Sequence, residues 1–396
     1  MVGRGASRPR TSDDATDTDS AEPSRDRLPS LTGLRGWAAL LVVLYHFSTD
    51  LGRVPGVDAL VAYGRTGVTL FFVLSGFVLA YTYPRAGAVP WRVFYWRRFA
   101  RVWPLHVAVL AGAAVLLRAI DRGQSGSELL AALFLVHAWS PRFSDDTLDV
   151  SWSISAEAFF YLVFPVVLAA AQWPGRWRRS LGLLFVLSAI WFVVVSGYAA
   201  DQASRGAWEL DYLPPVRLVH FAAGVVVGVA FHRGLRCPLR LRTAVATTVA
   251  FHLALQLWVR LPAEVPLHPY SGSQALVFPL FALLIWAAAD SDRGGASYRV
   301  LAGPWALRLG HWSFALYLLH PLTSILWRGV AGQPSGLPTV LLAWATCLTV
   351  GVVGAAVAYI CFERPVERWL RRRGPSDPGR APVNRPASAT PGPGRP

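Results

Sequence analysis

Lysine is absent from the sequence, and charged residues of either sign are scarce. Of the 396 residues, 38 are basic, all of them arginine, and charged residues make up only 15% of the chain, against 54% hydrophobic residues. Soluble domains usually carry about a quarter charged residues, so this composition favours a polytopic membrane protein. Arginine without lysine, beside abundant Ala, Gly and Pro, also favours a GC-rich and therefore bacterial genome.

Cysteine is scarce too, which argues against a disulfide framework. Cys237, Cys347 and Cys361 lie far apart and lack the spacing of a metal site, so we expect them at apolar positions and expect no bound metal. The first apolar run starts too late and is too long for the core of a signal peptide, so no cleavable signal is expected.

The formal net charge of +15 raises the alternative of a nucleic-acid-binding protein. That function needs basic residues gathered on one soluble face. The arginines instead lie mostly in short loops between apolar runs. We therefore expect the partners to include membrane lipid and no nucleic acid.

The apolar runs lie between two polar ends. Residues 1–29 and the Pro-rich residues 374–396 are predicted to be disordered, and residues 30–373 to form one membrane domain. A membrane span needs about 20 mostly apolar residues. This criterion predicts an all-α polytopic fold of about ten transmembrane helices, near residues 33–52, 65–83, 101–119, 153–172, 180–199, 216–233, 243–259, 273–289, 312–329 and 338–361.

The loops indicate the orientation of these helices. Arginine is enriched in alternate loops, as the positive-inside rule requires if both termini are cytoplasmic. The apolar segment 129–139 is too short to span and is predicted to be an interfacial or re-entrant helix. Counting it as a span would place the basic residues 175–179 outside, so ten spans fit better.

Arg35 and His46 bracket the apolar run LRGWAALLVVLYHF. They are eleven positions apart, about three helical turns, so they share one helix face about 16 Å apart. Ionisable groups inside a span are costly and usually functional. Arg35 alone could be a snorkelling anchor and His46 alone a core histidine, but neither explanation accounts for their common face.

The segment GRTGVTLFFVLSGF combines glycines with a serine in an apolar run. Gly64, Gly67 and Gly76, with Ser75, would allow a neighbouring helix to pack closely. The functional alternative is that bare backbone at Gly76 leaves room beside Ser75 for a thin ligand arm.

The segment WRVFYWRRFARVWP carries a basic face before the third span. Arg101 lies four residues after Arg97 and three after Arg98, so the three share one side of a helix. They could be a positive-inside anchor. They could equally clamp phosphate, because guanidinium groups match phosphate oxygens in geometry.

The segment DVSWSISAEAFFYLVFP places Ser153, Glu157 and Tyr161 on one helix face. A glutamate in such a span needs a partner. A histidine from another helix is the obvious candidate, because a carboxylate would fix its tautomer and raise its basicity.

Two weaker features lie near the end of the chain. HWSFALYLLHPL carries a polar stripe of Ser313, Tyr317 and His320, and FERP places Glu363 and Pro365 at a helix exit. The second feature is also compatible with a helix terminus beside a cytoplasmic anchor.

In this order, these motifs resemble the acyltransferase-3 family of integral membrane O-acyltransferases. The match runs from LTGLRGW to FERP and covers most of the chain between its polar ends. The resemblance implies transfer of an acyl group, often acetyl, from cytoplasmic acyl-coenzyme A to a hydroxyl of a glycan or glycosylated small molecule. Acyl-coenzyme A would be a donor substrate and no cofactor would be bound permanently.

The family's motifs map onto particular residues. They are matched by Arg35 with His46, by Arg98 with Arg101, and by Ser153 with Glu157. One departure is Thr69, which stands where many members acting on envelope polysaccharides carry an acidic residue. That departure weakens an assignment to polysaccharide substrates.

Six residues are predicted to bind the donor: Arg35, Arg97, Arg98, Arg101, Ser75 and Gly76. The arginines would hold the coenzyme A phosphates near the cytoplasmic surface, and the pantetheine arm would run inward past the serine and the glycine. His46 would act as general base, Glu157 would orient it, and Ser153 belongs to the same catalytic group. Direct transfer and a covalent acyl-histidine are both compatible with this arrangement.

Two alternatives belong to other classes of protein. Polar stripes on several helices also suit a transporter or a translocase of a glycan or lipid-linked substrate, although the sequence shows no inverted repeat. A non-catalytic scaffold would leave His46 and Glu157 without a function.

Overall fold

The computed structural model describes residues 28–120 apart from 86 and 88, and then 123–144, 150–172, 179, 212–260, 269–296 and 298–375. All regular elements within these ranges are helical, and no strand occurs among them. The main helices are α1 (Pro29–Asp50), α2 (Val57–Val61), α3 (Thr66–Thr82), α4 (Trp91–Ala119), α5 (Gly126–Leu133), α7 (Trp152–Gln172), α10 (Pro214–His232), α11 (Leu241–Arg260), α12 (Pro269–Arg293), α14 (Pro304–Ala331), α15 (Leu337–Ala358) and α16 (Arg364–Arg373). Shorter elements are α6 (Pro141–Ser144), α13 (Arg299–Ala302), a 3₁₀ turn (His137–Trp139) and a π-helical turn (Tyr359–Glu363).

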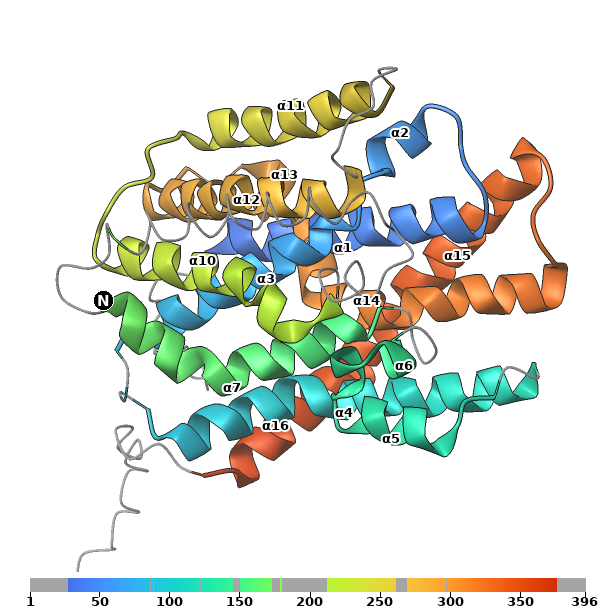
Figure 1. The fold of residues 1–396 in the computed structure, drawn as a ribbon, viewed down its shortest axis with the longest axis horizontal. Helices are drawn as coiled ribbons and strands as arrows, with labels where there is room; N and C mark the ends of the chain where they lie inside the picture. The colour runs from blue at the N-terminus through green and yellow to red at the C-terminus, as the bar shows by residue number, and fades with distance from the viewer. Residues whose placement is uncertain are drawn as a thin grey trace, which may run out of the picture.

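The long helices form a bundle whose members lie roughly side by side (Figure 1). α11 and α12 lie at one edge, and α4, α5 and α16 lie at the other. The most extensive helix contacts are those of α3 with α10 and of α1 with α14. Six segments in the described part of the chain are long and apolar enough to cross a membrane: Pro29–Asp50, Val57–Thr82, Trp91–Ala119, Trp152–Gln172, Pro214–His232 and Leu337–Arg373.

The predicted all-α fold is therefore confirmed for the described residues, and the helix positions agree well with those expected. Each expected span inside these ranges coincides with a helix. The span expected at 180–199 lies outside the described residues, as do nearly all of the two polar ends. Two helices begin earlier than expected. α4 starts at Trp91 because its basic face continues the same helix, and α14 starts at Pro304, a residue suited to a first helical position.

Glycines of α3 allow it to touch helices on two sides. A β-carbon at Gly67 would lie 2.7 Å from the Val42 side chain of α1, and one at Gly76 would lie 2.1 Å from the carbonyl oxygen of Phe221 in α10. The close packing expected from these glycines is thus present. At Gly76 itself the backbone of α10 fills the space, so this glycine leaves no room for a ligand arm.

Replacing Gly76 with alanine should destabilise the protein by about 1–3 kcal/mol, because α3 and α10 must move apart. Gly112 of α4 is the matched control, since a β-carbon there meets no atom within 4 Å. Gly112→Ala should leave stability unchanged or raise it slightly. The measurement is the melting temperature of both variants in the same detergent, and equal melting temperatures would contradict the packing described for Gly76.

The short apolar segment after α4 folds back along that helix. α5 begins with a capping box formed by Ser125 and Glu128, and at its other end Trp103 of α4 donates to the Leu133 carbonyl at 3.1 Å. The helix stops there, and Leu135 has a φ of 58°. The prediction that this segment is too short for a span is confirmed.

His137 follows this break and is buried against His106 and Ser151. Its Nε2 lies 2.9 Å from the hydroxyl of Ser151, and its ring is stacked 6.5 Å from that of His106. Burial, together with the neighbouring His106, lowers the pKa of His137 from 6.5 to about 4. The folded protein therefore favours the neutral imidazole.

This shift predicts a loss of stability in acid. Between about pH 6.5 and pH 4 the unfolded chain binds a proton at His137 more readily than the folded protein does. Its contribution to stability is complete above pH 6.5 and is lost as the pH falls toward 4. The melting temperature of the wild type should therefore fall over this range by more than that of His137→Gln, which keeps a polar partner for Ser151. Parallel curves for the two proteins would contradict the assignment.

Candidate functional site

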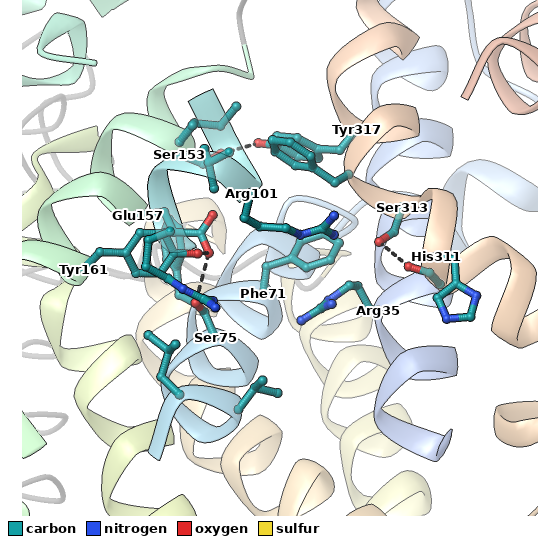
Figure 2. A pocket seen from close by; sticks show the side chains of 18 of the residues that line it. Arg35, Phe71, Ser75, Arg101, Ser153, Glu157, Tyr161, His311, Ser313 and Tyr317 are labelled. Atoms are coloured by element: carbon teal, nitrogen blue, oxygen red, sulfur yellow. Dashed lines mark hydrogen bonds between the residues drawn. The ribbon is translucent and has the colours of Figure 1, made fainter. Parts of the chain in front are cut away.

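A cavity of about 370 Å³ lies between α1, α3, α4, α7, α14 and α16 (Figure 2). It brings together six of the nine residues predicted from the sequence as site residues. These six are Arg35, Ser75, Arg98, Arg101, Ser153 and Glu157. Helices far apart in the sequence thus converge on one pocket, which we call the arginine pocket.

Arg35 and Arg98 are unpaired cations at the wall of the arginine pocket. Neither side chain makes a hydrogen bond or ion pair with any residue that the structure describes. The Arg98 guanidinium carbon lies 5.8 Å from the ring centroid of Tyr161 and 6.0 Å from that of Tyr83, and its buried Nε has no partner. Cations that form no ion pair with the described residues and lie beside a cavity are suited to bind an anion.

Arg101 differs from these two because it is already paired. It donates to Glu363 and, at 3.2 Å, to Glu367, both from the C-terminal part of the chain. Four arginines and two glutamates line the pocket, so its wall carries an excess of positive charge. The predicted clustering of Arg35, Arg98 and Arg101 is therefore observed.

Glu157 lies inside the pocket and accepts two hydrogen bonds on one carboxylate oxygen. The donors are the Ser75 hydroxyl at 2.9 Å and the Tyr161 hydroxyl (Figure 2). The predicted face of Ser153, Glu157 and Tyr161 thus points into the pocket. The predicted partner was wrong, because the glutamate bonds to Ser75 of α3 and Tyr161 of its own helix and not to His46.

Ser153 closes one end of the pocket together with Tyr317 of α14. Their hydroxyl groups are hydrogen-bonded at 2.7 Å, and each lies within hydrogen-bond distance of the carbonyl of Val150, at 3.0 Å from Ser153 and 2.8 Å from Tyr317. Phe71 packs edge-on against Tyr317 at 6.0 Å. The polar stripe noted on this helix therefore contributes a wall of the site.

His46 is absent from the residues that line the arginine pocket. Its Nδ1 lies 2.9 Å from the Val42 carbonyl one turn earlier in α1, and its ring centroid lies 5.0 Å from that of His320. His320 in turn lies 5.9 Å from Tyr317. The candidate base is thus linked through His320 to Tyr317 in the pocket wall.

Two other predicted donor-binding residues also lie outside the lining. Arg97 is half-buried on α4 but does not face the pocket. Gly76 faces α10, as described above. Of the basic face of α4, only Arg98 and Arg101 therefore line the pocket.

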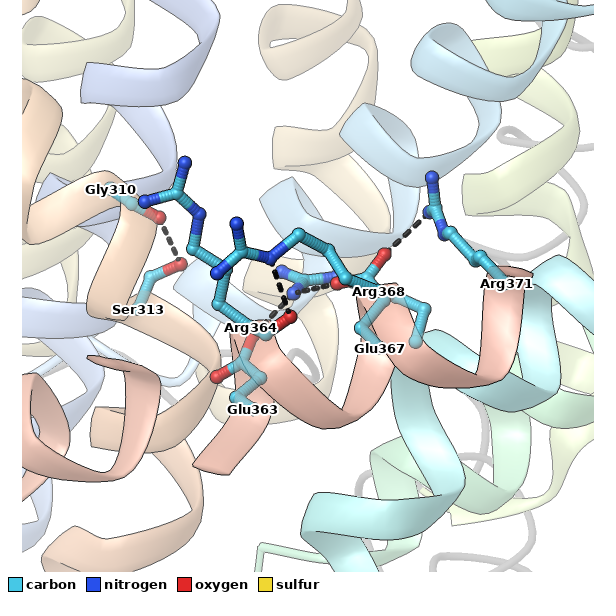
Figure 3. A network of polar contacts seen from close by, with 8 residues as sticks. Gly310, Ser313, Glu363, Arg364, Glu367, Arg368 and Arg371 are labelled. Carbon is cyan, nitrogen blue, oxygen red and sulfur yellow. Dashed lines mark hydrogen bonds and ion pairs between the residues drawn. The ribbon is translucent and has the colours of Figure 1, made fainter. Parts of the chain in front are cut away.

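The C-terminal helix α16 supplies site residues that the sequence analysis missed. Glu367 and Arg371 line the pocket, and Glu367 bridges Arg101, at 3.2 Å, to Arg371, at 2.5 Å. Figure 3 shows the contact between Glu367 and Arg371. The sequence of this segment is also compatible with a helix terminus beside a cytoplasmic anchor. The spacing of Glu363, Glu367 and Arg371 at every fourth residue could have indicated one functional helix face.

The bundle of apolar helices, with an arginine-rich pocket inside it, is that of a multi-pass membrane protein. The chain belongs to the acyltransferase family whose model, described as an acyltransferase domain, matches residues 28–361. It is therefore a membrane acyltransferase that transfers groups other than aminoacyl groups, and the resemblance found in the sequence is confirmed.

Relatives of this chain come from several bacteria. The acyltransferase MdmB of Streptomyces mycarofaciens is 30% identical over 386 residues, which cover 88% of this chain and 94% of that protein. The exopolysaccharide production protein ExoZ of Rhizobium meliloti is 29% identical over 316 residues, covering 78% and 92%. The "Putative O-acetyltransferase SACOL0978" of Staphylococcus aureus is 29% identical over 174 residues, covering 40% and 27%. No solved structure matches the chain.

Proposed function

We propose that the protein transfers an acyl group, acetyl by preference, from acyl-coenzyme A to a sugar hydroxyl of a glycan or a glycosylated small molecule. The observation that carries the proposal is the pair of unpaired arginines, Arg35 and Arg98, at the wall of the arginine pocket. Guanidinium groups bind phosphate oxygens well, and coenzyme A carries several phosphates.

The size of the pocket suits one arm of this donor. A cavity of about 370 Å³ is at the small end of the range for ligand sites, so it can hold an acyl-pantetheine chain while the nucleotide stays outside. The arm would lie beside Ser75 and end near Ser153 and Tyr317. Glu157 keeps the wall of this channel in place through its bonds to Ser75 and Tyr161.

His46 is the proposed general base. Because its Nδ1 faces the Val42 carbonyl, the tautomer with hydrogen on Nδ1 places the basic lone pair of the imidazole on Nε2. The acceptor oxygen attacks the thioester carbon as Nε2 removes the hydroxyl proton, the carbon–sulfur bond breaks, and the proton passes to the departing coenzyme A thiolate. The base and the thioester would meet at the Tyr317 end of the pocket.

The sidedness of the reaction follows from the arginines of the loops. We propose ten spans in a bacterial plasma membrane, with residues 1–29 and 374–396 as cytoplasmic tails around one membrane domain, because arginine alternates between loops on this topology. Arg35, Arg98 and α16 would then lie at the cytoplasmic end, where acyl-coenzyme A is made. His46 would lie farther toward the outer surface.

The acceptor is proposed from the relatives and from one residue. One relative is named for exopolysaccharide production, which favours a sugar hydroxyl. Thr69 stands where many polysaccharide-modifying members carry an acidic residue, which favours a glycosylated small molecule within that class.

The test is acyl transfer by membranes that contain the protein, supplied with radiolabelled acetyl-coenzyme A and candidate sugar acceptors. Label should appear in an ester that mild base releases, and only with the intact protein. Comparing cells with and without the protein by mass spectrometry should show one product lacking an acyl mass. Counter-flow uptake of a glycan without any acylated product would instead support a transporter.

Replacing Arg98 with alanine should raise the KM for acyl-coenzyme A about tenfold or more while lowering kcat less, because one charge-assisted contact to phosphate is lost. Arg118→Ala is the matched control, since Arg118 is an exposed arginine of the same helix away from the pocket. Steady-state kinetics of both variants are the measurement. A large fall in kcat with an unchanged KM would contradict the phosphate role of Arg98.

A further inference from the structure

We propose that the mouth of the arginine pocket binds the adenosine 3′-phosphate end of the donor, with the adenine against the rings of His311 and Tyr359 and the 3′-phosphate on Arg364. This inference rests on the proposed acyl transfer and deepens it, because it makes the donor a free coenzyme A thioester. An acyl carrier protein presents the same phosphopantetheine arm but has neither the adenine nor the 3′-phosphate.

His311 and Tyr359 form an aromatic pair at the edge of the pocket. Both residues line the arginine pocket, and the side chain of His311 is exposed while that of Tyr359 is half-buried. Their ring centroids are 6.0 Å apart, and the ring planes are inclined by only 14°. Flat rings that remain accessible to solvent form a platform on which a nucleotide base stacks. The aromatic pair therefore suits the adenine of the donor.

The aromatic pair lies away from the proposed site of reaction. His311 precedes Tyr317 on α14 by six residues, which is about 9 Å along the helix axis. Tyr317 lies beside Ser153, where the acyl group is proposed to end (Figure 2). His311 lies toward Arg35, whose charge acts on its ring. A donor with its acyl group near Tyr317 would therefore leave the pocket beside His311.

Arg364 adds a positive charge at the rim of this mouth. Its side chain is exposed and makes no hydrogen bond or ion pair with any residue that the structure describes. The side chain points toward Gly310, the residue before His311 (Figure 3), and among the described residues its charge acts most strongly on the His311 ring. Because a guanidinium group matches the oxygens of a phosphate, Arg364 is placed to bind a phosphate beside the aromatic pair.

The carboxylates near the mouth are already engaged with another arginine. Glu363 and Glu367 both pair with Arg101, which leaves the charge of Arg364 uncompensated by them. The two unpaired arginines of the pocket wall described above can serve the diphosphate of coenzyme A. Arg364 would then serve its separate 3′-phosphate.

The two sides of α16 distinguish this role of Arg364 from that of a membrane anchor. Arg371 lies seven residues after Arg364, nearly on the same side of the helix, and it lines the pocket. Arg373 lies nine residues after Arg364 and therefore on the opposite side, with its guanidinium carbon 4.2 Å from the ring centroid of Trp369. An exposed tryptophan beside an exposed arginine is typical of contact with lipid headgroups. Anchoring thus explains Arg373 and leaves Arg364 for a ligand.

Three probes separate the parts of the donor: coenzyme A, 3′-dephospho-coenzyme A and 4′-phosphopantetheine. Their dissociation constants for the purified full-length protein are measured by titration calorimetry. We expect 3′-dephospho-coenzyme A to bind the wild type about tenfold more weakly than coenzyme A does, as the loss of one charge-assisted contact implies. The affinity for 4′-phosphopantetheine should be lower by about a further tenfold, because the stacked base is lost as well.

Substitutions at the mouth should each remove the recognition of one part of the donor. Arg364→Ala should bind coenzyme A about tenfold more weakly but 3′-dephospho-coenzyme A as tightly as the wild type does. His311→Ala should weaken the binding of both nucleotides about tenfold and leave that of 4′-phosphopantetheine unchanged, whereas His311→Phe keeps a flat ring and should retain most of the affinity. Arg373→Ala is the matched control, since it removes the same charge from the opposite side of α16 and should leave all three constants unchanged.

Equal affinity of the wild type for the three probes would overturn the inference but not the proposed acyl transfer. An equal loss of coenzyme A affinity in Arg364→Ala and Arg373→Ala would also overturn it, because the overall charge of α16 would then be responsible. Absence of binding by all three probes, together with no acyl transfer from acetyl-coenzyme A, would count against the proposed function itself, so the two failures are distinguishable.

Discussion

Replacing His46 with alanine should reduce acyl transfer by about 10²–10⁴-fold, the contribution typical of a positioned general base. Coenzyme A should bind the variant as tightly as it binds the wild type, because His46 does not line the arginine pocket. The measurements are turnover of labelled acetyl-coenzyme A and calorimetric binding of coenzyme A to the purified protein. This substitution should affect the acyl-transfer step without affecting coenzyme A binding, whereas substitutions of residues that contact the donor affect both.

The control for this substitution is His232→Ala, which removes an exposed histidine from the last turn of α10. It should leave both measurements unchanged. Full turnover by His46→Ala would remove His46 from the mechanism. Weakened coenzyme A binding in His46→Ala would show that the donor extends past Tyr317 to the histidine.

The helices could be predicted from the sequence because their cause is local. The length of an apolar run and the positions of proline and glycine can be read from neighbouring residues in the sequence. The observed ranges of α1, α3 and α7 are therefore close to the expected ones. The glycines of α3 indicated close packing but not the neighbour. Only the fold shows that Gly67 faces α1 and Gly76 faces α10.

Parts of the site could be predicted for a related reason. Periodicity showed that Arg98 and Arg101 share a face, and that Ser153, Glu157 and Tyr161 share another, and both faces line the arginine pocket. Periodicity within one helix says nothing about which helix lies opposite. The sequence therefore predicted a histidine as the partner of the Glu157 carboxylate, whereas the structure shows Ser75 and Tyr161.

The sequence did not identify α16 as part of the site, because a membrane anchor and a pocket wall can have the same arginine-rich composition. A run of arginines at the end of a membrane domain is typical of a cytoplasmic anchor. In the fold, however, Glu367 links Arg101 to Arg371 at the pocket wall. α16 follows a π-helical segment, a feature often found at functional sites, and composition does not show that this helix lies against α4.

Glu157 provides the second prediction with a large expected effect. Glu157→Ala leaves the Ser75 and Tyr161 hydroxyls without their common acceptor and removes a negative charge from beside the arginines of the pocket. Leaving the buried Tyr161 hydroxyl without a partner costs about 1–3 kcal/mol. We therefore expect kcat/KM for acetyl-coenzyme A to fall about 10²-fold or more.

Glu157→Gln distinguishes the two roles considered for this residue. Both hydroxyls donate to one carboxylate oxygen, so the amide oxygen of glutamine can accept both bonds and keep the channel wall intact. The lost negative charge should then strengthen phosphate binding and lower the donor KM, with only a modest fall in kcat. A carboxylate that oriented the catalytic histidine would behave differently, because its amide variant presents the wrong hydrogen-bonding group and kcat then falls by about 10⁴ in a serine-protease triad. A steep loss of kcat at unchanged KM in Glu157→Gln would restore the direct partnership with His46, whereas a lower KM would place Glu157 in the donor channel.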